Sequence, residues 1–146
     1  MLSDREIREH LDRGALIENH AEECIQPASY DLRVGSRKAV AILPHEHVLV
    51  STIERVTLPD DVAGMVWLRS TLARRGVLFG GGWVDPGFRG NLTISLYNAG
   101  RDPIELEPGQ RIAQLIFLRL PPTSGYAGRY QDSEGVRGPK DKERGG

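Results

Sequence analysis

The chain of 146 residues is long enough for one domain with a modest hydrophobic core. Its formal net charge of -1 argues against a binder of duplex nucleic acid, which is normally basic. Cys24 is the only cysteine, which excludes an internal disulfide and a cysteine-based zinc site. The charged N-terminal residues and the lack of any long apolar run predict a cytoplasmic protein that does not span a membrane.

A short helix is predicted over residues 4–13. Ser3 and Glu6 form a capping-box pattern at its start, and Gly14 is placed to end it. Residues 15–26 show no clean period, so we expect a loop there with at most a short strand.

Short stretches of alternating apolar and polar residues then recur, separated by turns rich in proline, glycine and aspartate. The predicted strands are 27–35, 38–43, 48–52, 54–58, 62–68, 92–97, 104–106 and 110–120. Residues 70–76 break the pattern and are expected to form one helical turn with Ser70 as its cap. Many short strands with frequent turns predict an all-β barrel or sandwich.

From Pro121 onward the composition changes to glycine, proline and charged residues, with little apolar surface to bury. The chain is therefore expected to divide into a β domain over residues 1–120 and a C-terminal tail over 121–146. Such a tail is flexible or becomes ordered against a partner or a ligand, like a lid.

Residues 80–98 contain the clearest candidate for a binding site. Three glycines at 80–82 allow close approach of a ligand to the backbone, and the single carboxylate of Asp85 follows them. Asp85 would act as a general base on water or hold a metal-bound water. The stretch fits a pocket for a small planar ligand, but it fits equally a hairpin whose glycines only serve its turns.

A second candidate is the cationic segment that begins at Arg69. Arg69 and Arg74 supply guanidinium groups, Ser70 and Thr71 supply hydroxyls, and a turn offers free backbone amides. This combination suits a phosphate or another oxyanion. It also fits a helix cap beside solvated arginines, which the residues alone favour.

Three further residues are left open by the pattern. Asp31 and Gln114 each lie in a predicted strand and fit either a site or the polar face of a sheet. Phe88 would stack on a ring or a sugar, or fill the apolar side of a hairpin.

His45 and His47 form a possible metal-binding pair, but without further clustered ligands a loop is the simpler interpretation.

The motifs taken together resemble the trimeric all-β dUTPases and their relatives, the dCTP deaminases, over residues 2–138. The segments that carry the resemblance are, in chain order, 26–33, 68–74, 82–90, 108–116 and 129–131 with 138–139. The resemblance implies a distorted jelly-roll or β-clip barrel of the dUTPase type. It also implies a homotrimer in which more than one subunit builds each site, and no nucleic-acid partner.

The resemblance further implies a deoxynucleoside triphosphate as ligand. The residues it assigns to the phosphates are Arg69, Ser70, Thr71, Arg74 and Gln114. Backbone around Gly82 and Trp83 would read the pyrimidine edge, and Phe88 would pack on the deoxyribose. Tyr126 and Arg129 in the tail would close over the nucleotide.

The resemblance gives the two aspartates different tasks. Asp31 would orient waters around a Mg²⁺ ion bound to the triphosphate. Asp85 would activate the water that hydrolyses dUTP. The implied cofactor is therefore Mg²⁺, carried by the substrate.

Position 95 departs from the deaminase pattern. The deaminases carry a glutamate there for proton transfer, whereas this chain has Ser95, whose hydroxyl does not exchange a proton readily near neutral pH. The sequence therefore predicts a dUTP diphosphatase that forms dUMP and pyrophosphate. The alternatives are a dCTP deaminase, with one or two activities, in which another residue replaces the glutamate, and a non-catalytic nucleotide-binding regulator.

Overall fold

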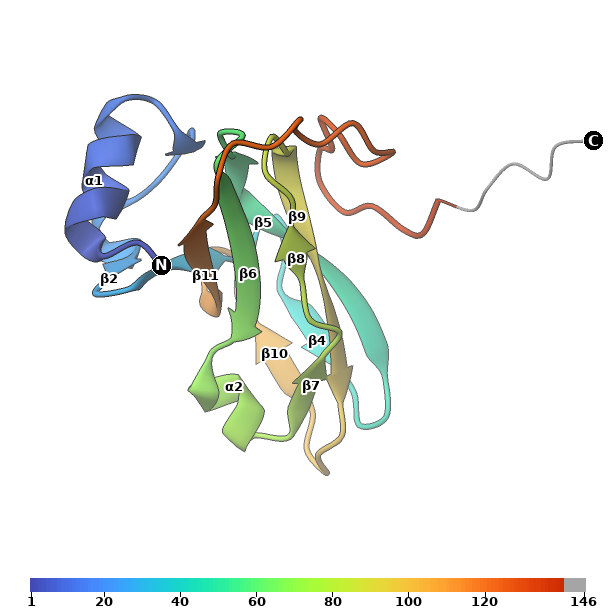
Figure 1. The fold of residues 1–146 in the computed structure, drawn as a ribbon. Helices are drawn as coiled ribbons and strands as arrows, with labels where there is room; N and C mark the ends of the chain where they lie inside the picture. The colour runs from blue at the N-terminus through green and yellow to red at the C-terminus, as the bar shows by residue number, and fades with distance from the viewer. Residues whose placement is uncertain (141–146) are drawn as a thin grey trace, which may run out of the picture.

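Strands arranged in three sheets form the framework of residues 1–140, the part of the chain that the computed structural model describes (Figure 1). In chain order the strands are β1 (Leu16–Ile17), β2 (Ile25–Gln26), β3 (Ser29–Arg33), β4 (Val40–Ile42), β5 (His47–Thr57), β6 (Val62–Leu68), β7 (Val77–Phe79), β8 (Trp83–Val84), β9 (Arg89–Asn98), β10 (Ile104–Leu106) and β11 (Arg111–Arg119). One sheet has the order β1-β5-β9-β7, the second has the order β2-β3-β11-β6-β8, and β10 pairs with β4. The prediction of an all-β fold is confirmed.

The N-terminal helix α1 (Asp4–Asp12) begins with the predicted capping box. The Ser3 amide donates to Glu6 Oε2 over 2.9 Å, and the Glu6 amide donates to Ser3 Oγ over 3.3 Å. Ile7 and Leu11 are buried and attach the helix to the barrel. No helix within the described range has the length and apolar character needed to cross a membrane.

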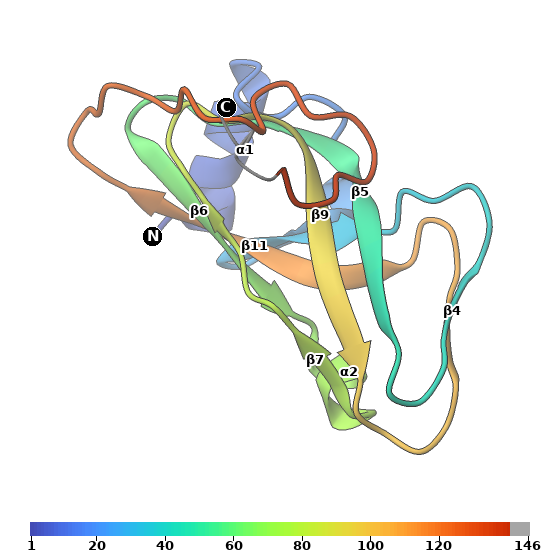
Figure 2. The ribbon, with the colours of Figure 1, turned by 90° about the vertical axis from the view of Figure 1, so that its right-hand side faces the viewer.

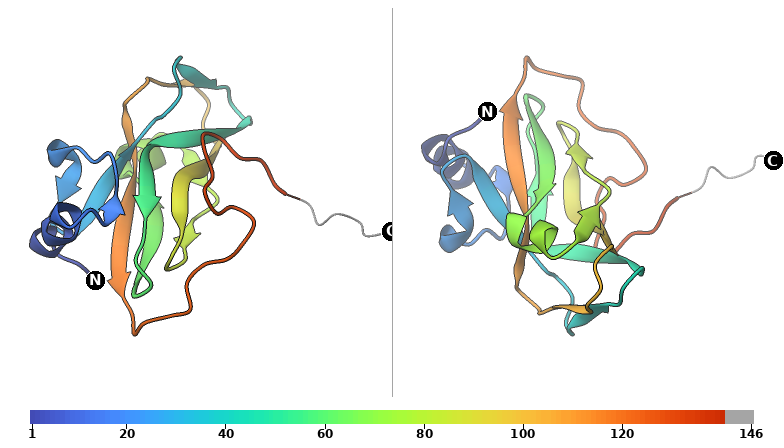
Figure 3. Two further views of the ribbon diagram at one scale, coloured as in Figure 1. Left: turned by 90° about the horizontal axis from the view of Figure 1, so that it is seen from above. Right: turned by 90° about the horizontal axis from the view of Figure 1, so that it is seen from below.

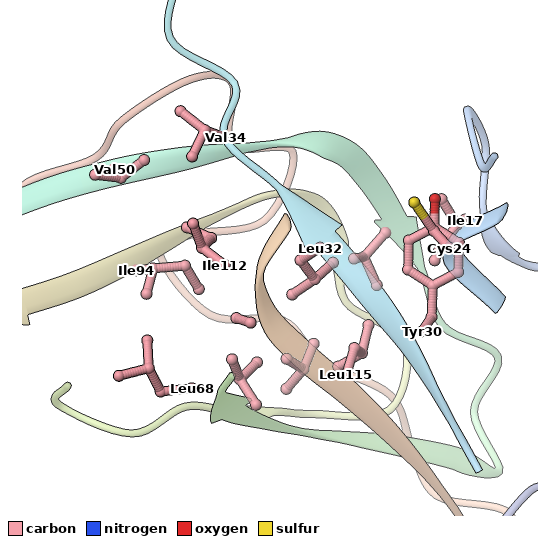
Figure 4. Close-up of a cluster of buried hydrophobic side chains, with 14 of the residues drawn as sticks. Ile17, Cys24, Tyr30, Leu32, Val34, Val50, Leu68, Ile94, Ile112 and Leu115 are labelled. Carbon is pink, nitrogen blue, oxygen red and sulfur yellow. The ribbon is translucent and has the colours of Figure 1, made fainter. Parts of the chain in front are cut away.

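The two larger sheets face each other and enclose the core (Figure 2). Figure 4 shows Leu32 and Leu115 from one sheet and Val50 and Ile94 from the other gathered between them. All four are buried, and each such side chain contributes about 1.5–3 kcal/mol on leaving water. Leu32 and Ile94 alternate with polar residues in the sequence, whereas Val50 and Leu115 lie in continuous apolar runs that do not show which side faces inward.

The long strand β5 differs from the prediction, which divided it into two strands at residue 53. Its register against β9 shifts between Ser51 and Arg55, as at a β-bulge. The Asn91 side chain donates to the backbone oxygens of Thr52 and Glu54 over 3.1 and 3.0 Å. The irregular residues thus keep hydrogen-bond partners, and the strand continues through them.

The strands β7 and β8 were not predicted. They have three and two residues, too few to show an alternating pattern. β7 pairs with the end of β9 and β8 pairs with β6, so the residues between them, 80–82, connect the two larger sheets. This connection places the glycine-rich stretch at the border of both sheets.

A buried carboxylate anchors β5 to β3. Glu54 is completely buried, and its Oε1 accepts hydrogen bonds from Arg33 Nε at 2.7 Å and from Tyr30 Oη at 3.2 Å. The Arg33 amide donates to the second oxygen, Oε2, over 2.9 Å. Burial raises the pKa of the Tyr30 hydroxyl, which therefore stays a neutral donor at physiological pH.

The tail after β11 runs back over the barrel and crosses the start of β9 (Figure 2). The Tyr126 amide donates to Pro86 O over 2.8 Å, and Ser133 forms a parallel bridge with Gly90. The predicted tail also includes residues 141–146, which lie outside the described residues. The described part of the tail thus packs against its own chain.

Removal of the Asp132 charge is expected to loosen the tail. Asp132 accepts hydrogen bonds from Arg89 at 3.1 and 3.2 Å and from Arg55 at 3.2 Å. The Arg89 guanidinium lowers the pKa of Asp132, so this contact is complete at neutral pH and is lost only as the pH falls below the usual aspartate range. In Asp132→Asn, trypsin should cleave after Arg129 about two- to threefold faster, because exposed ion pairs contribute little each. Mass spectrometry of the digest measures the rate, and an unchanged rate would show that the ion pairs do not hold the tail.

Candidate functional site

A pocket of about 410 Å³ lies between the β8–β9 connection, the face of β9 and the tail. We call it the β8–β9 pocket. Its lining residues from the barrel and the tail include Leu49, Trp83, Asp85, Phe88, Thr93, Tyr126, Tyr130 and Arg137. The pocket joins a carboxylate, aromatic rings and one arginine, as expected for a site that takes a small planar ligand.

Asp85 lies at the exposed turn after β8, on the wall of this pocket. The indole of Trp83, two residues earlier on β8, donates its Nε1 proton to Asp85 Oδ1 over 3.0 Å. This hydrogen bond fixes the direction of the carboxylate. Trp83 was expected to act through its backbone, and the structure adds this side-chain contact.

Phe88 is buried and lies with its ring edge-to-face against Tyr126 of the tail, with ring centroids 5.6 Å apart. Its ring belongs to the core, as one alternative of the sequence had it, and it also lines the pocket. Tyr126 is half-buried and lines the pocket as well. The Arg129 side chain instead donates to Lys140 O over 2.8 Å and lies outside the lining.

The glycines of residues 80–90 have different tasks. Gly90 has a φ of +145°, and a Cβ atom there would lie 2.8 Å from the Ser133 backbone of the tail. A Cβ at Gly82 would lie 3.1 Å from the Val66 side chain, and Gly82 O accepts the Val66 amide at 2.8 Å. Gly90 thus serves the approach of the tail, and Gly82 serves the contact of β8 with β6.

The Asp31 cluster forms a second group of candidate residues. Asp31 Oδ2 lies 3.4 Å from Arg111 Nη1 and 3.9 Å from Arg69 Nε. Asp31 is buried, whereas both arginines are more than a third exposed. Gln114 is paired with Asp31 across β11 and β3, on the same side of the sheet. The carboxylate therefore holds two exposed cations beside an amide, which suits an anionic ligand. Arg111 was missed because it precedes the alternating part of β11.

The helical turn α2 (Ser70–Arg74) follows Arg69. Its N-cap is Arg69, with no side-chain cap bond, so the prediction that Ser70 caps the turn was wrong. The reason is that Arg69 has an extended backbone and its carbonyl already accepts the Leu72 amide at 3.1 Å. Ser70, Thr71 and Arg74 are exposed in the turn and available to a ligand.

The two groups of candidate residues lie in different parts of the chain's surface. None of Arg69, Ser70, Thr71, Arg74, Gln114 and Asp31 lines the β8–β9 pocket. Figures 1 and 2 place α2 at the bottom of the barrel and the tail at its top, and Figure 3 shows the tail from above and α2 from below. One chain therefore does not bring Asp85 together with the cationic residues.

The described residues offer a magnesium ion no set of direct ligands of their own. Residues 1–140 contain no group of three or more His, Cys, Asp or Glu that could hold a metal. Within this range Asp31 Oδ1 is buried without a hydrogen-bond partner, so it can accept one bond from a metal-bound water. The neighbouring arginines disfavour direct binding of a cation to Asp31.

Ser95 forms a pair with a histidine. Ser95 Oγ lies 2.8 Å from His47 Nε2 of the neighbouring strand β5. The Gly80 amide donates to Ser95 O over 3.1 Å, so Ser95 also borders the glycine-rich connection. His47 was weighed only as a metal ligand in the sequence, because the register that brings β5 against β9 is not visible there.

Comparison with known protein families gives a consistent assignment. A family model described as dCTP deaminase-like matches residues 36–120. The dCTP deaminase of Pyrococcus horikoshii is 47% identical, with 91% of this chain and 92% of the relative covered. A protein of Aquifex aeolicus named dCTP deaminase, dUMP-forming, is 36% identical, with 93% and 92% covered.

Solved structures confirm the fold. The native dUTPase of EIAV superimposes with a TM-score of 0.58 and 27% identity, and 81% of this chain and 92% of that one are covered. The 2′-deoxycytidine 5′-triphosphate deaminase of Agrobacterium tumefaciens gives a TM-score of 0.69 at 20% identity, with 80% and 46% covered. The expected dUTPase-type barrel is therefore present.

Proposed function

Because the chain belongs to the dCTP deaminase-like family, we propose that it deaminates dCTP to dUTP and ammonia. The observation that carries this proposal is the 47% identity to a dCTP deaminase over 92% of that relative's length. This proposal reverses the order of the two activities expected from the sequence, in which dUTP hydrolysis came first because of Ser95. The β8–β9 pocket has the size and aromatic lining that a nucleoside needs.

A second candidate activity is the hydrolysis of dUTP to dUMP and pyrophosphate. Two observations favour it: Ser95 stands where a deaminase would carry a glutamate, and Asp85 presents an oriented carboxylate in the pocket. The relative named as dUMP-forming is 36% identical. Both activities use the same nucleotide site, so one protein can carry both.

In either reaction, different residues of the chain would bind different parts of the nucleotide. Arg69 and Arg111, held by Asp31, would bind the triphosphate with Gln114, and Mg²⁺ on the phosphates would neutralise their remaining charge. In the β8–β9 pocket, Phe88 would pack on the deoxyribose. The tail would shield the nucleoside from bulk solvent while the reacting water stays in the pocket.

We further infer a homotrimer whose sites are shared between chains. The separation of Asp85 from the cationic residues within one chain supports this, since a complete site then needs a second copy. A mixture of Arg69→Ala and Asp85→Asn chains, each expected to be inactive in dUTP hydrolysis, should regain part of that activity after joint refolding. Size-exclusion chromatography with light scattering measures the assembly. A mixture as inactive as its components would argue for sites within single chains.

One assay separates the activities. The purified protein is incubated with Mg²⁺ and either dCTP or dUTP, and ammonia, pyrophosphate and the nucleotides are quantified by chromatography. Ammonia from dCTP is the expected result, and pyrophosphate from dUTP in addition would show that the second activity is present as well. Pyrophosphate from dUTP without ammonia from dCTP would replace deamination by the second candidate. Binding of either nucleotide without turnover would leave a regulatory nucleotide-binding protein.

A further inference from the structure

The Ser95–His47 pair lies on a face of the sheet that leads directly to the β8–β9 pocket. Leu49 is opposite Ser95 in the β5–β9 register, and Thr93 precedes it by two residues, so all three share one face. Leu49 and Thr93 both line the pocket. Ser95 is partly exposed and continues this face beyond Thr93, next to the residues that line the pocket.

The pair also borders the backbone that would contact the base. Gly80 donates its amide to Ser95 O at 3.1 Å, and a Cβ at Gly80 would lie 3.4 Å from the Ser95 Cβ. A base whose edge meets the glycine-rich connection would thus have the Ser95 hydroxyl as a neighbour. His47 is exposed on the far side of that hydroxyl.

We propose that His47, acting through the Ser95 hydroxyl, provides the proton transfers of deamination that a carboxylate at position 95 would otherwise provide. The inference rests on the proposed deamination of dCTP. The carrying geometry is the 2.8 Å contact between His47 Nε2 and Ser95 Oγ, on the strand face whose neighbouring residues Leu49 and Thr93 line the pocket. Imidazole is the side chain best suited to exchange protons near neutral pH, which a lone serine is not.

In the proposed relay, one water supplies the oxygen and both protons that convert the cytosine to uracil and ammonia. The oxygen of a water bonds to C4 of the cytosine, while one of its protons passes through Ser95 to His47 and is returned to N3. The second proton of that oxygen then moves to the exocyclic amine. The C4–N4 bond breaks, ammonia leaves, and the C4 carbonyl of uracil remains. Neither an oxidant nor a reductant is needed.

The charged and titratable groups around His47 are compatible with this task. Tyr97 lies opposite His47 on β9, and His45 Nδ1 contacts Tyr97 Oη at 3.3 Å. From the tail and from the β8 turn, Arg137 and Asp85 line the adjoining pocket. In the part of the chain that the structure describes, no carboxylate forms a salt bridge with His47. The His47 imidazole therefore contacts the Ser95 hydroxyl without a competing ion pair.

The test compares steady-state deamination of dCTP by the wild type and by His47→Gln from pH 5 to pH 9. The glutamine variant should lose about 100-fold in kcat with little change in KM, the lower range for loss of a general acid or base. The wild-type rate should fall in acid as the imidazole becomes protonated, and this acid limb should be absent from the variant. Circular dichroism confirms folding, which an exposed position should not disturb.

Two further variants sharpen the result. Ser95→Glu supplies a carboxylate directly, so adding it to His47→Gln should restore most of kcat. His45→Gln, a histidine on the same chain segment that contacts Tyr97 instead of Ser95, should keep wild-type kcat.

The outcomes separate the two claims. A wild type that deaminates dCTP equally well with His47→Gln, or whose acid limb persists in that variant, would overturn the inference alone. Failure of Ser95→Glu to rescue the glutamine variant would also count against it. A wild type that releases no ammonia from dCTP overturns the proposed function and this inference together.

Discussion

Asp85→Asn is expected to abolish the hydrolysis of dUTP while nucleotide binding stays largely intact. An amide does not accept the proton of the attacking water, so the rate should fall by about 10²–10⁴-fold. The substitution preserves shape, and Trp83 Nε1, now 3.0 Å from Asp85 Oδ1, can still donate to the amide oxygen. Pyrophosphate release measures the rate, and isothermal titration calorimetry with a non-hydrolysable dUTP analogue measures binding.

The matched control is Trp83→Phe, which keeps the carboxylate but removes its indole donor. The pocket should then retain a base with a less fixed direction, and hydrolysis should fall less than in Asp85→Asn. If Asp85→Asn hydrolyses dUTP at the wild-type rate, Asp85 is not the base. If it fails to bind the analogue, Asp85 instead serves binding.

Arg33→Ala should reduce the free energy of unfolding by about 3 kcal/mol, because it leaves the buried charge of Glu54 without its partner. This value is at the low end for a buried pair because the Arg33 side chain is 20% exposed. Burial opposes the charged guanidinium, but the hydrogen bond and charge of Glu54 outweigh it and raise the pKa of Arg33. Urea unfolding followed by circular dichroism measures the change.

Two comparisons identify the cause of that loss. Arg33→Met combined with Glu54→Leu should recover much of the stability, since an apolar pair carries no stranded charge. Arg8→Ala, which removes an exposed ion pair with Glu22, should change stability little. An Arg33→Ala protein as stable as the wild type would mean that water reaches Glu54.

Much of the fold was predictable because buried apolar residues recur at regular intervals in the longer strands. β6 has the predicted bounds, and α1 begins at the predicted capping box. The exceptions have local causes. β5 looked like two strands because the residues at its bulge break the alternation, and β7 and β8 are too short for any period to appear.

The candidate site was predictable as residue types but not as an arrangement. Asp85, Trp83, Phe88 and Tyr126 do gather around one pocket. Arg69 does not line this pocket, and its position depends on the way the two sheets fold over each other, which no local pattern records. The contact of His47 with Ser95 depends likewise on strand register across 48 positions of sequence. Motif order identified the family, whereas the contact between His47 and Ser95 became visible only in three dimensions.

The placement of the two tryptophans gives the molecule an optical reporter at each group of candidate residues. Trp83 holds its indole proton on Asp85 at the pocket wall, and Trp67 lies opposite Gln114 in the sheet that carries Asp31. Both rings are about half exposed, so a bound nucleotide would change their solvation. Intrinsic fluorescence of Trp67→Phe would then follow the arrival of the base, and that of Trp83→Phe the arrival of the phosphates. Mixing in a stopped-flow instrument would show which end of the nucleotide docks first.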